Sequence, residues 1–159
     1  MILSKTFRVG DKIEVEGISG NVVEVGIRAT RIRTFDNELV IVPNGTMATA
    51  IIKNYHQPNH KARVVVPFGV EYGTKIEKAR KVALDVAKGM KDIIKDDPAP
   101  FVVFKEMADS SLNFELRFWV EDVNNSWPKH WEANEKLYNA LNKAKIGIPF
   151  PSMTVYKGK

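Results

Sequence analysis

Cysteine is absent from this chain of 159 residues. Without a thiol, the chain can form no disulfide framework, no thiolate nucleophile and no zinc site built on cysteine. Long hydrophobic runs are also missing, because the longest stretches without a polar side chain, 64–70 and 98–104, are far shorter than the roughly 20 residues of a membrane-spanning helix. The first residues lack the apolar segment of a signal peptide. These absences predict a soluble chain in a reducing, intracellular compartment.

The chain also lacks a clustered charge of one sign, and it has few motifs typical of catalysis or cofactor binding. The net charge of +5 is spread along the chain rather than clustered, so nucleic-acid binding is not expected. Glycine-rich phosphate loops are missing. His130 has no nucleophile near it in the sequence, and Pro58 opposes a helix that would direct His56 and His60 at one metal ion. We therefore expect no catalytic, cofactor-binding or metal-binding residues, no cofactor and no enzymatic activity.

The first part of the chain, residues 1–60, contains about five short strand-like runs separated by glycine and proline turns. Short strands at this spacing are typical of a small all-β domain. We predict a five-stranded β-barrel of the Sm or SH3 type. The segment 56–60 is the best candidate for the boundary with a second domain.

The clearest pattern within this first domain is a hairpin. Two strand-like runs, 30–35 and 38–43, flank Asp36-Asn37, which favours a two-residue turn. Such a turn would place Ile32 opposite Ile41. One face would then carry Thr30, Ile32, Thr34, Leu39 and Ile41, and the other would carry Arg31, Arg33, Phe35, Val40 and Val42. The mixed second face indicates either a subunit interface, at Arg31, Arg33, Val40 and Val42, or an ordinary exposed face on which arginine stems cover valines.

The second part, residues 61–159, changes to an alternation of strands and helices. Strands are predicted at 63–68, 101–106 and 112–120, the last from strict alternation of apolar and polar residues. A capping box at Thr74 opens one helix. A second helix begins at Ser126 and is expected to bury Trp131, Leu137, Tyr138, Leu141 and Ala144. With a final extended piece at 153–156, the order β-α-β-β-α-β predicts a ferredoxin-like α+β domain.

Motifs in both domains resemble the mechanosensitive channels of small conductance. The first domain is similar to the β-domain of that family at Phe7, Gly10, Asp11, Gly20, Thr30, Arg33, Pro43, Asn44 and Asn54. The second domain is similar to the carboxy-terminal α/β domain of the family at Pro98, Pro149 and Pro151. The membrane helices of the family are not in the chain, which we expect to be a shortened form of a longer protein.

The resemblance implies the cytoplasmic cage of an ion channel in the cell membrane. Seven copies would form a ring, and Met153, Val155 and Tyr156 would join the other copies in a small parallel barrel. The intact channel would open under membrane tension and release ions and small osmolytes. Two other classes stay open on the residues alone: a nucleic-acid-binding module, since both domain types host that function, and a small hydrolase that uses His130.

Overall fold

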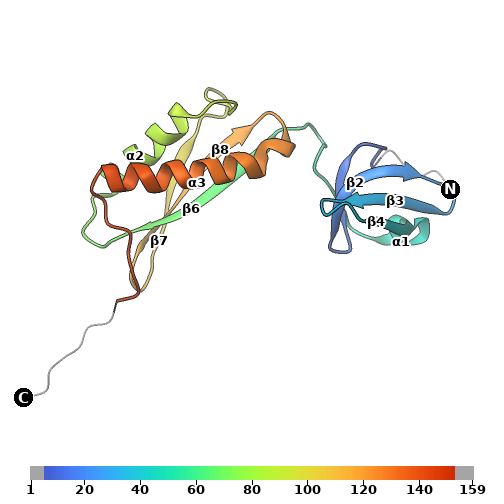
Figure 1. Cartoon of the computed structure of the whole chain (residues 1–159), viewed down its shortest axis with the longest axis horizontal. Helices are drawn as coiled ribbons and strands as arrows, with labels where there is room; N and C mark the ends of the chain where they lie inside the picture. Colours follow the sequence, from blue (N-terminus) through green and yellow to red (C-terminus); the bar gives the residue numbers. More distant parts are fainter. Residues whose placement is uncertain (1–5, 153–159) are drawn as a thin grey trace, which may run out of the picture. The chain divides into compact units, whose positions relative to one another are not determined.

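The computed structural model describes residues 6–152 and forms two compact units, residues 1–60 and residues 61–159 (Figure 1). Unit 1 is a five-stranded antiparallel sheet in the order β4-β3-β2-β1-β5. Its elements are β1 (Lys12–Val15), β2 (Ile18–Val25), β3 (Ala29–Thr34), β4 (Leu39–Pro43), α1 (Asn44–Thr49) and β5 (Ile52–Asn54). The helix α1 was not predicted from the sequence, which indicated only a turn at Pro43-Asn44-Gly45.

The hairpin between β3 and β4 differs from the prediction by one residue. Asn37 takes a positive φ of 64° and its N–H donates to the carbonyl of Thr34 at 3.1 Å, so three residues rather than two form the loop. A three-residue loop that ends in a left-handed residue is a common hairpin connection. The shift places Ile32 opposite Val40. Our predicted register was therefore wrong.

The corrected register reverses the two faces of β4, because successive side chains of a strand point to opposite faces. Val42 is buried and Val40 packs against the core of unit 1, so neither valine lies on the outer face where we had predicted an interface. Leu39 and Ile41 are exposed instead, by 56% and 59%. The core of unit 1 consists of Phe7, Ile13, Val15, Val22, Ile32, Val42 and Met47.

Unit 2 is a layer of two helices on a three-stranded sheet of order β6-β8-β7 (Figure 1). Its elements are β6 (Ala62–Val70), α2 (Ile76–Gly89), β7 (Phe101–Met107), β8 (Leu112–Val120), the short 3₁₀ helix η1 (Val123–Asn125) and α3 (Ser126–Lys143). The predicted alternation of β8 is confirmed, since Leu112, Phe114, Leu116, Phe118 and Val120 are all buried. The proposed fourth strand, 153–156, lies outside the described residues.

Two expectations for the helices of unit 2 were wrong. Lys75 is the residue before α2 and no side chain caps that helix, so the capping box at Thr74 does not form. In α3, Leu137 is buried as predicted, but Trp131 and Tyr138 are exposed by 62% and 58%. Leu141 is also buried as predicted, Ala144 packs partly against the core, and Ala133 is a buried residue that the prediction lacked. Among residues 6–152, neither α2 nor α3 nor any other helix has the length and apolar character to cross a membrane.

Candidate functional site

Several motif residues tie the start of unit 1 to its last strand. Asn54, at the end of β5, donates from its side-chain amide to the Asp11 carboxylate at 2.8 Å and to the carbonyl of Thr6 at 2.9 Å. Phe7 is buried beside this network, and Gly10 adopts a φ of 94°, which L-residues with a side chain rarely adopt. These residues therefore fix the path by which the chain enters the sheet.

A second group of motif residues is organised by Asn44, which is only 4% exposed. Its side-chain amide donates to the carbonyls of Gly26 and Ile27 at 2.9 and 3.0 Å, and its side-chain oxygen accepts from the buried Thr30 hydroxyl at 3.0 Å. Pro43 immediately precedes the helix that Asn44 begins. A buried amide with three partners holds the β2–β3 turn in one conformation.

Gly20 of β2 pairs with Thr34 of β3 and lies close to the backbone carbonyl of the preceding residue, Arg33. A Cβ atom on Gly20 would lie 2.4 Å from the carbonyl oxygen of Arg33, which is closer than any real contact. Only glycine fits this position. The Arg33 side chain itself is exposed on the outer face of the sheet.

The motif residues of unit 2 lie near the ends of its strands. Pro149 approaches within 3.7 Å of the position that a Cβ on Gly69 would occupy, and Gly147 accepts a 3.0 Å hydrogen bond from the N–H of Glu71. Pro98 is half-buried just before β7, and Pro151 is exposed. These contacts hold the segment after α3 against the end of β6. Met153, Val155 and Tyr156 lie outside the described residues.

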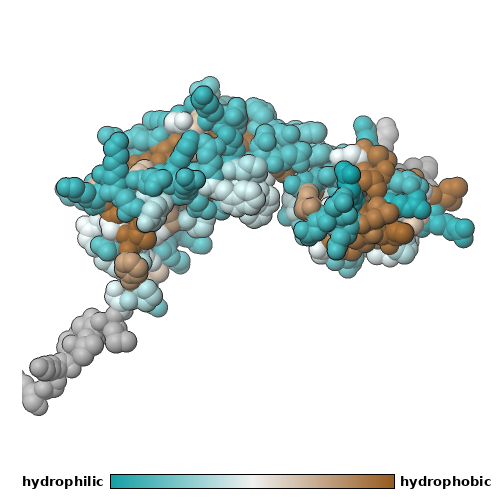
Figure 2. Space-filling model, in the orientation of Figure 1, coloured by the Kyte–Doolittle hydropathy of each residue, from teal (hydrophilic) through white to brown (hydrophobic). Residues whose placement is uncertain are grey.

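An apolar outer face on unit 1 is the first candidate assembly surface. Leu39 and Ile41 stand on β4 opposite Arg33 and Arg31 of β3, and Arg31 forms an ion pair with Glu24. Figure 2 shows apolar residues gathered on one side of unit 1. Arg31 and Arg33 therefore lie on the face predicted for an interface, but their apolar neighbours are Leu39 and Ile41. The tendency of asparagine to adopt a left-handed backbone conformation, here at Asn37, was the sequence signal that could have indicated the three-residue loop and therefore the correct faces of β4.

An ion cluster occupies the sheet face of unit 2 that the helices leave open. The Glu115 carboxylate is 8% exposed and accepts two hydrogen bonds from the Arg117 guanidinium, at 2.6 and 2.9 Å, while the Lys105 ammonium lies 3.4 Å away. The Arg117 hydrogen bonds hold the pKa of Glu115 below its ordinary value, against the opposing effect of burial and with further help from Lys105. Paired in this way, the carboxylate is a structural anchor for β8.

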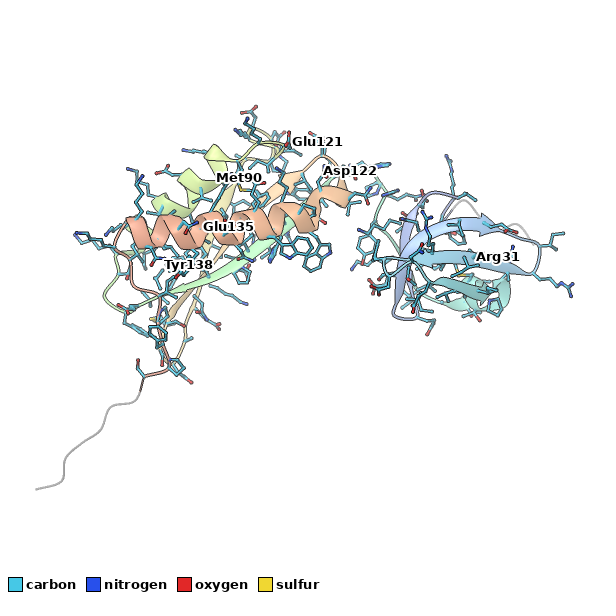
Figure 3. The ribbon with its side chains drawn as sticks, viewed as in Figure 1. Arg31, Met90, Glu121, Asp122, Glu135 and Tyr138 are labelled. Carbon is cyan, nitrogen blue, oxygen red and sulfur yellow. The ribbon has the colours of Figure 1, made fainter. Side chains whose placement is uncertain are left out.

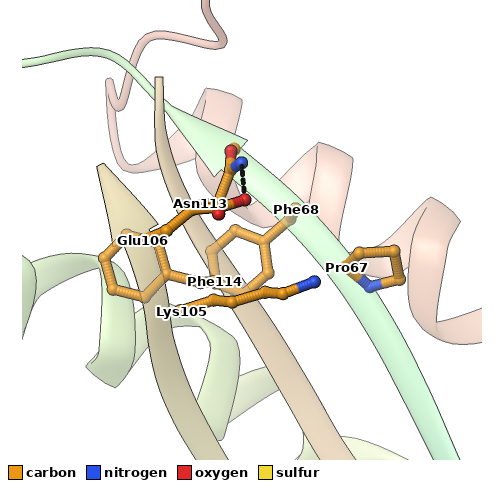
Figure 4. A pocket seen from close by; sticks show the side chains of 7 residues that line it. Pro67, Phe68, Lys105, Glu106, Asn113 and Phe114 are labelled. Atoms are coloured by element: carbon orange, nitrogen blue, oxygen red, sulfur yellow. Dashed lines mark hydrogen bonds between the residues drawn. The ribbon is translucent and has the colours of Figure 1, made fainter. Parts of the chain in front are cut away.

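Beside this cluster is a shallow cavity of about 250 Å³ (Figure 4). It is lined by Pro67, Phe68, Gly69, Lys105, Glu106, Asn113 and Phe114. Its polar groups already have partners: the Asn113 amide donates to Glu106 at 3.1 Å, and Lys105 pairs with Glu115. His130, the residue that the sequence offered for catalysis, contacts the Asn134 amide at 3.1 Å and the edge of Trp127. Neither arrangement supplies a nucleophile and a base.

These observations define the class of protein: a small all-β unit is followed by an α/β unit with two helices. The model of the family described as "Mechanosensitive ion channel, beta-domain" matches residues 1–57, and the model described as "Mechanosensitive ion channel MscS, C-terminal" matches residues 64–148. The chain therefore belongs to the MscS family of mechanosensitive ion channels. This is a channel family rather than an enzyme family.

Individual relatives agree with this assignment. The small-conductance mechanosensitive channel of Edwardsiella ictaluri is 35% identical, covering 98% of this chain and 54% of the relative. The small-conductance channel MscMJ of Methanocaldococcus jannaschii is 33% identical, covering 100% of this chain and 46% of the relative. The crystal structure of closed-state Helicobacter pylori MscS superposes with a TM-score of 0.90 at 30% identity, covering 99% of this chain and 62% of that one. The chain thus spans about half the length of the curated relatives.

Proposed function

We propose that this chain is the cytoplasmic part of a mechanosensitive channel of small conductance. The observation that carries the proposal is the match of both family models, in order, to the two units. The whole channel would lie in the cell membrane, open under membrane tension and pass ions and small osmolytes. The described residues would form the vestibule through which these solutes reach the pore. A nucleic-acid-binding role and a hydrolase role are not favoured by this match.

We further infer the fold types and the limits of the two domains. Unit 1 corresponds to an Sm/SH3-like barrel, supported by five short strands with α1 between β4 and β5. Unit 2 corresponds to a ferredoxin-like domain, supported by the order β6-β8-β7 and by helices that follow the first and third of its strands. Unit 1, residues 1–60, would be the membrane-proximal domain.

Assembly into a homoheptamer is part of this proposal. The outer face of unit 1 supports it, because Leu39 and Ile41 expose apolar surface whose burial on a neighbouring copy would stabilise a ring by about 25 cal/mol per Å². Arg31 and Arg33 lie beside these residues and would help to orient the two copies at the contact. Head-to-tail contacts between identical copies form a ring when the rotation from copy to copy closes.

The test is the molar mass of the chain in solution by light scattering. We expect a mass about seven times the 17.9 kDa of one chain. Ile41→Asp should dissociate the ring without changing the circular dichroism spectrum, and Thr49→Asp, also exposed on unit 1, is the matched control. A wild-type chain that stays monomeric at high concentration would contradict the heptamer. Deleting residues 152–159 tests the proposed terminal barrel: the deletion should weaken the ring and leave each subunit folded.

A further inference from the structure

Unit 2 displays three large aromatic side chains that its fold does not use. Trp127, Trp131 and Tyr138 of α3 are exposed by 60%, 62% and 58%. Residues four and seven positions apart lie on one side of an α-helix. All three therefore lie along one side of α3, with the Trp127 and Trp131 ring centroids 6.2 Å apart, and we call them the aromatic flank. Exposed aromatic surface of this kind is typical of protein interfaces.

The aromatic flank points away from α2. Ala140 and Lys143 of α3, with Ala144 just after it, line a groove together with residues of α2. At 100° per residue the flank lies about 170° around the helix from them. Figure 3 shows Tyr138 on the side of α3 toward β6. β6 is an edge strand, since within residues 6–152 it pairs with β8 alone. The flank therefore forms one lateral side of unit 2.

The opposite side of unit 2 has a complementary composition. Lys88 is exposed near the end of α2, and Lys95 follows shortly after it. Ile94 and Phe101 both pair with β8 on the side away from β6, and Phe101 is 41% exposed. We call Lys88, Lys95 and Phe101 the lysine edge. Within the unit, Arg117 already lies over the Phe101 ring, with 5.9 Å between guanidinium carbon and centroid.

The two surfaces lie at the same end of the unit. Lys129, in the first turns of α3, reaches Asp92 in the segment after α2 at 3.4 Å. The first half of the aromatic flank is therefore level with the lysine edge along the strand direction. A rotation axis parallel to the strands would bring the flank of one copy beside the lysine edge of the next.

We propose that the aromatic flank packs against the lysine edge of a second copy of this chain. The inference rests on the homo-oligomer proposed above and names a further contact within it, formed by unit 2. Lysine ammonium groups are attracted to the faces of tryptophan and tyrosine rings, and the apolar lysine stems and Phe101 cover the remaining ring surface. Because the two surfaces differ and lie on opposite sides, each copy uses both. Contacts of this kind continue from copy to copy until the ring closes.

The absence of cysteine makes a cross-linking test direct. The double variant Trp131→Cys with Lys95→Cys, treated with a short bis-maleimide, should give a ladder of covalent multimers on a denaturing gel. Each single variant should remain a single chain, because one cysteine of a head-to-tail contact has no cysteine opposite it. A dimer from Trp131→Cys alone would show that two flanks meet each other and would overturn the proposal. So would a double variant without a ladder.

Substitution provides a second measurement. Trp127→Ala with Tyr138→Ala should raise the dissociation constant of the oligomer at least about tenfold, because aromatic residues at the centre of an interface carry much of its binding energy. Met107→Ala, 73% exposed on β7, is the matched control and should leave it unchanged. If wild-type chain is oligomeric and either measurement fails to respond, this inference fails and the proposed function stands. If wild-type chain is monomeric at every concentration, this inference and the proposed heptamer both fail.

Discussion

The two units bury very different amounts of apolar surface. Among residues 6–152, seven buried apolar residues form the core of unit 1, whereas eighteen form the core of unit 2 between its sheet and its two helices. Unit 1 adds side-chain hydrogen bonds that hold its turns and its entry segment, namely the buried pair Asn44 and Thr30 and the half-buried pair Asn54 and Asp11. The buried carboxylate of unit 2, Glu115, pairs instead with Arg117 and Lys105 on the sheet. A small all-β unit with little apolar surface to bury therefore depends on specific hydrogen bonds to hold its turns. A two-layer α/β unit depends mainly on packing.

The largest expected effect is in the core of unit 2. Phe114 is 1% exposed, stacks on Phe68 and packs against the tilted ring of Phe104. Phe114→Ala should lower the free energy of unfolding of unit 2 by about 3–5 kcal/mol. The measurement is chemical denaturation followed by circular dichroism, which reports mainly on the helices of unit 2. Phe150→Ala, at an exposed phenylalanine of the same unit, is the control. An equal loss for both variants would argue against a central packing role for Phe114.

The corresponding change in the core of unit 1 should have a similar or somewhat smaller effect. Ile32 is fully buried opposite Val40. Ile32→Ala should lower the free energy of unfolding of unit 1 by about 2–5 kcal/mol. The exposed Ile41 of the same hairpin is the control, and Ile41→Ala should cost far less. Hydrogen exchange of the β3 and β4 amides measures both. A larger loss for Ile41→Ala would restore the register that the sequence predicted.

Removing a polar connection tests the dependence of unit 1 on hydrogen bonds. Asn44→Ala leaves the carbonyls of Gly26 and Ile27 without their amide donor, and the buried Thr30 hydroxyl without its acceptor. We expect a loss of about 1–3 kcal/mol, together with faster amide exchange in the β2–β3 turn. Thr49→Ala, on the exposed side of α1, is the control. Protection of that turn unchanged in Asn44→Ala would show that packing alone holds it.

The smallest effect concerns the ion cluster of unit 2 and depends on pH. The pKa of Glu115 is lowered in the folded unit, mainly by Arg117, from an ordinary value of 4.5. A lowered carboxyl pKa stabilises the fold above the unfolded value, and the stabilisation is lost as pH falls through the folded value. Glu115→Gln should therefore destabilise unit 2 at pH 7, and the difference from wild type should shrink below about pH 4. Melting temperatures across this range measure the difference.

Glu135→Gln, at an exposed position of α3, is the control for the pH experiment. It should show little difference from wild type at either pH. A difference between Glu115→Gln and wild type that stays constant down to pH 2 would mean that the carboxylate charge does not stabilise the sheet. The cluster would then act through shape and hydrogen bonding alone.

Local patterns in the sequence determined much of both units. Strict alternation fixed β8, because one face of that strand meets a continuous apolar layer. Glycine and proline turns marked the short strands of unit 1, and the motif residues by themselves pointed to the family. Local geometry was enough for these features because each depends on residues close together in the chain.

Tertiary structure decided which apolar residues are buried. In α3, helical periodicity places Trp131 and Tyr138 beside Leu137, but α2 and the sheet cover only part of the circumference and leave both aromatic rings exposed. In unit 1, one residue in the length of the β3–β4 loop decided whether Val42 or Ile41 is buried. A shift of one residue turns every side chain of a strand to the other face. A pattern along the chain gives the spacing of apolar residues. Only the packing of neighbouring elements gives the direction from which they are covered.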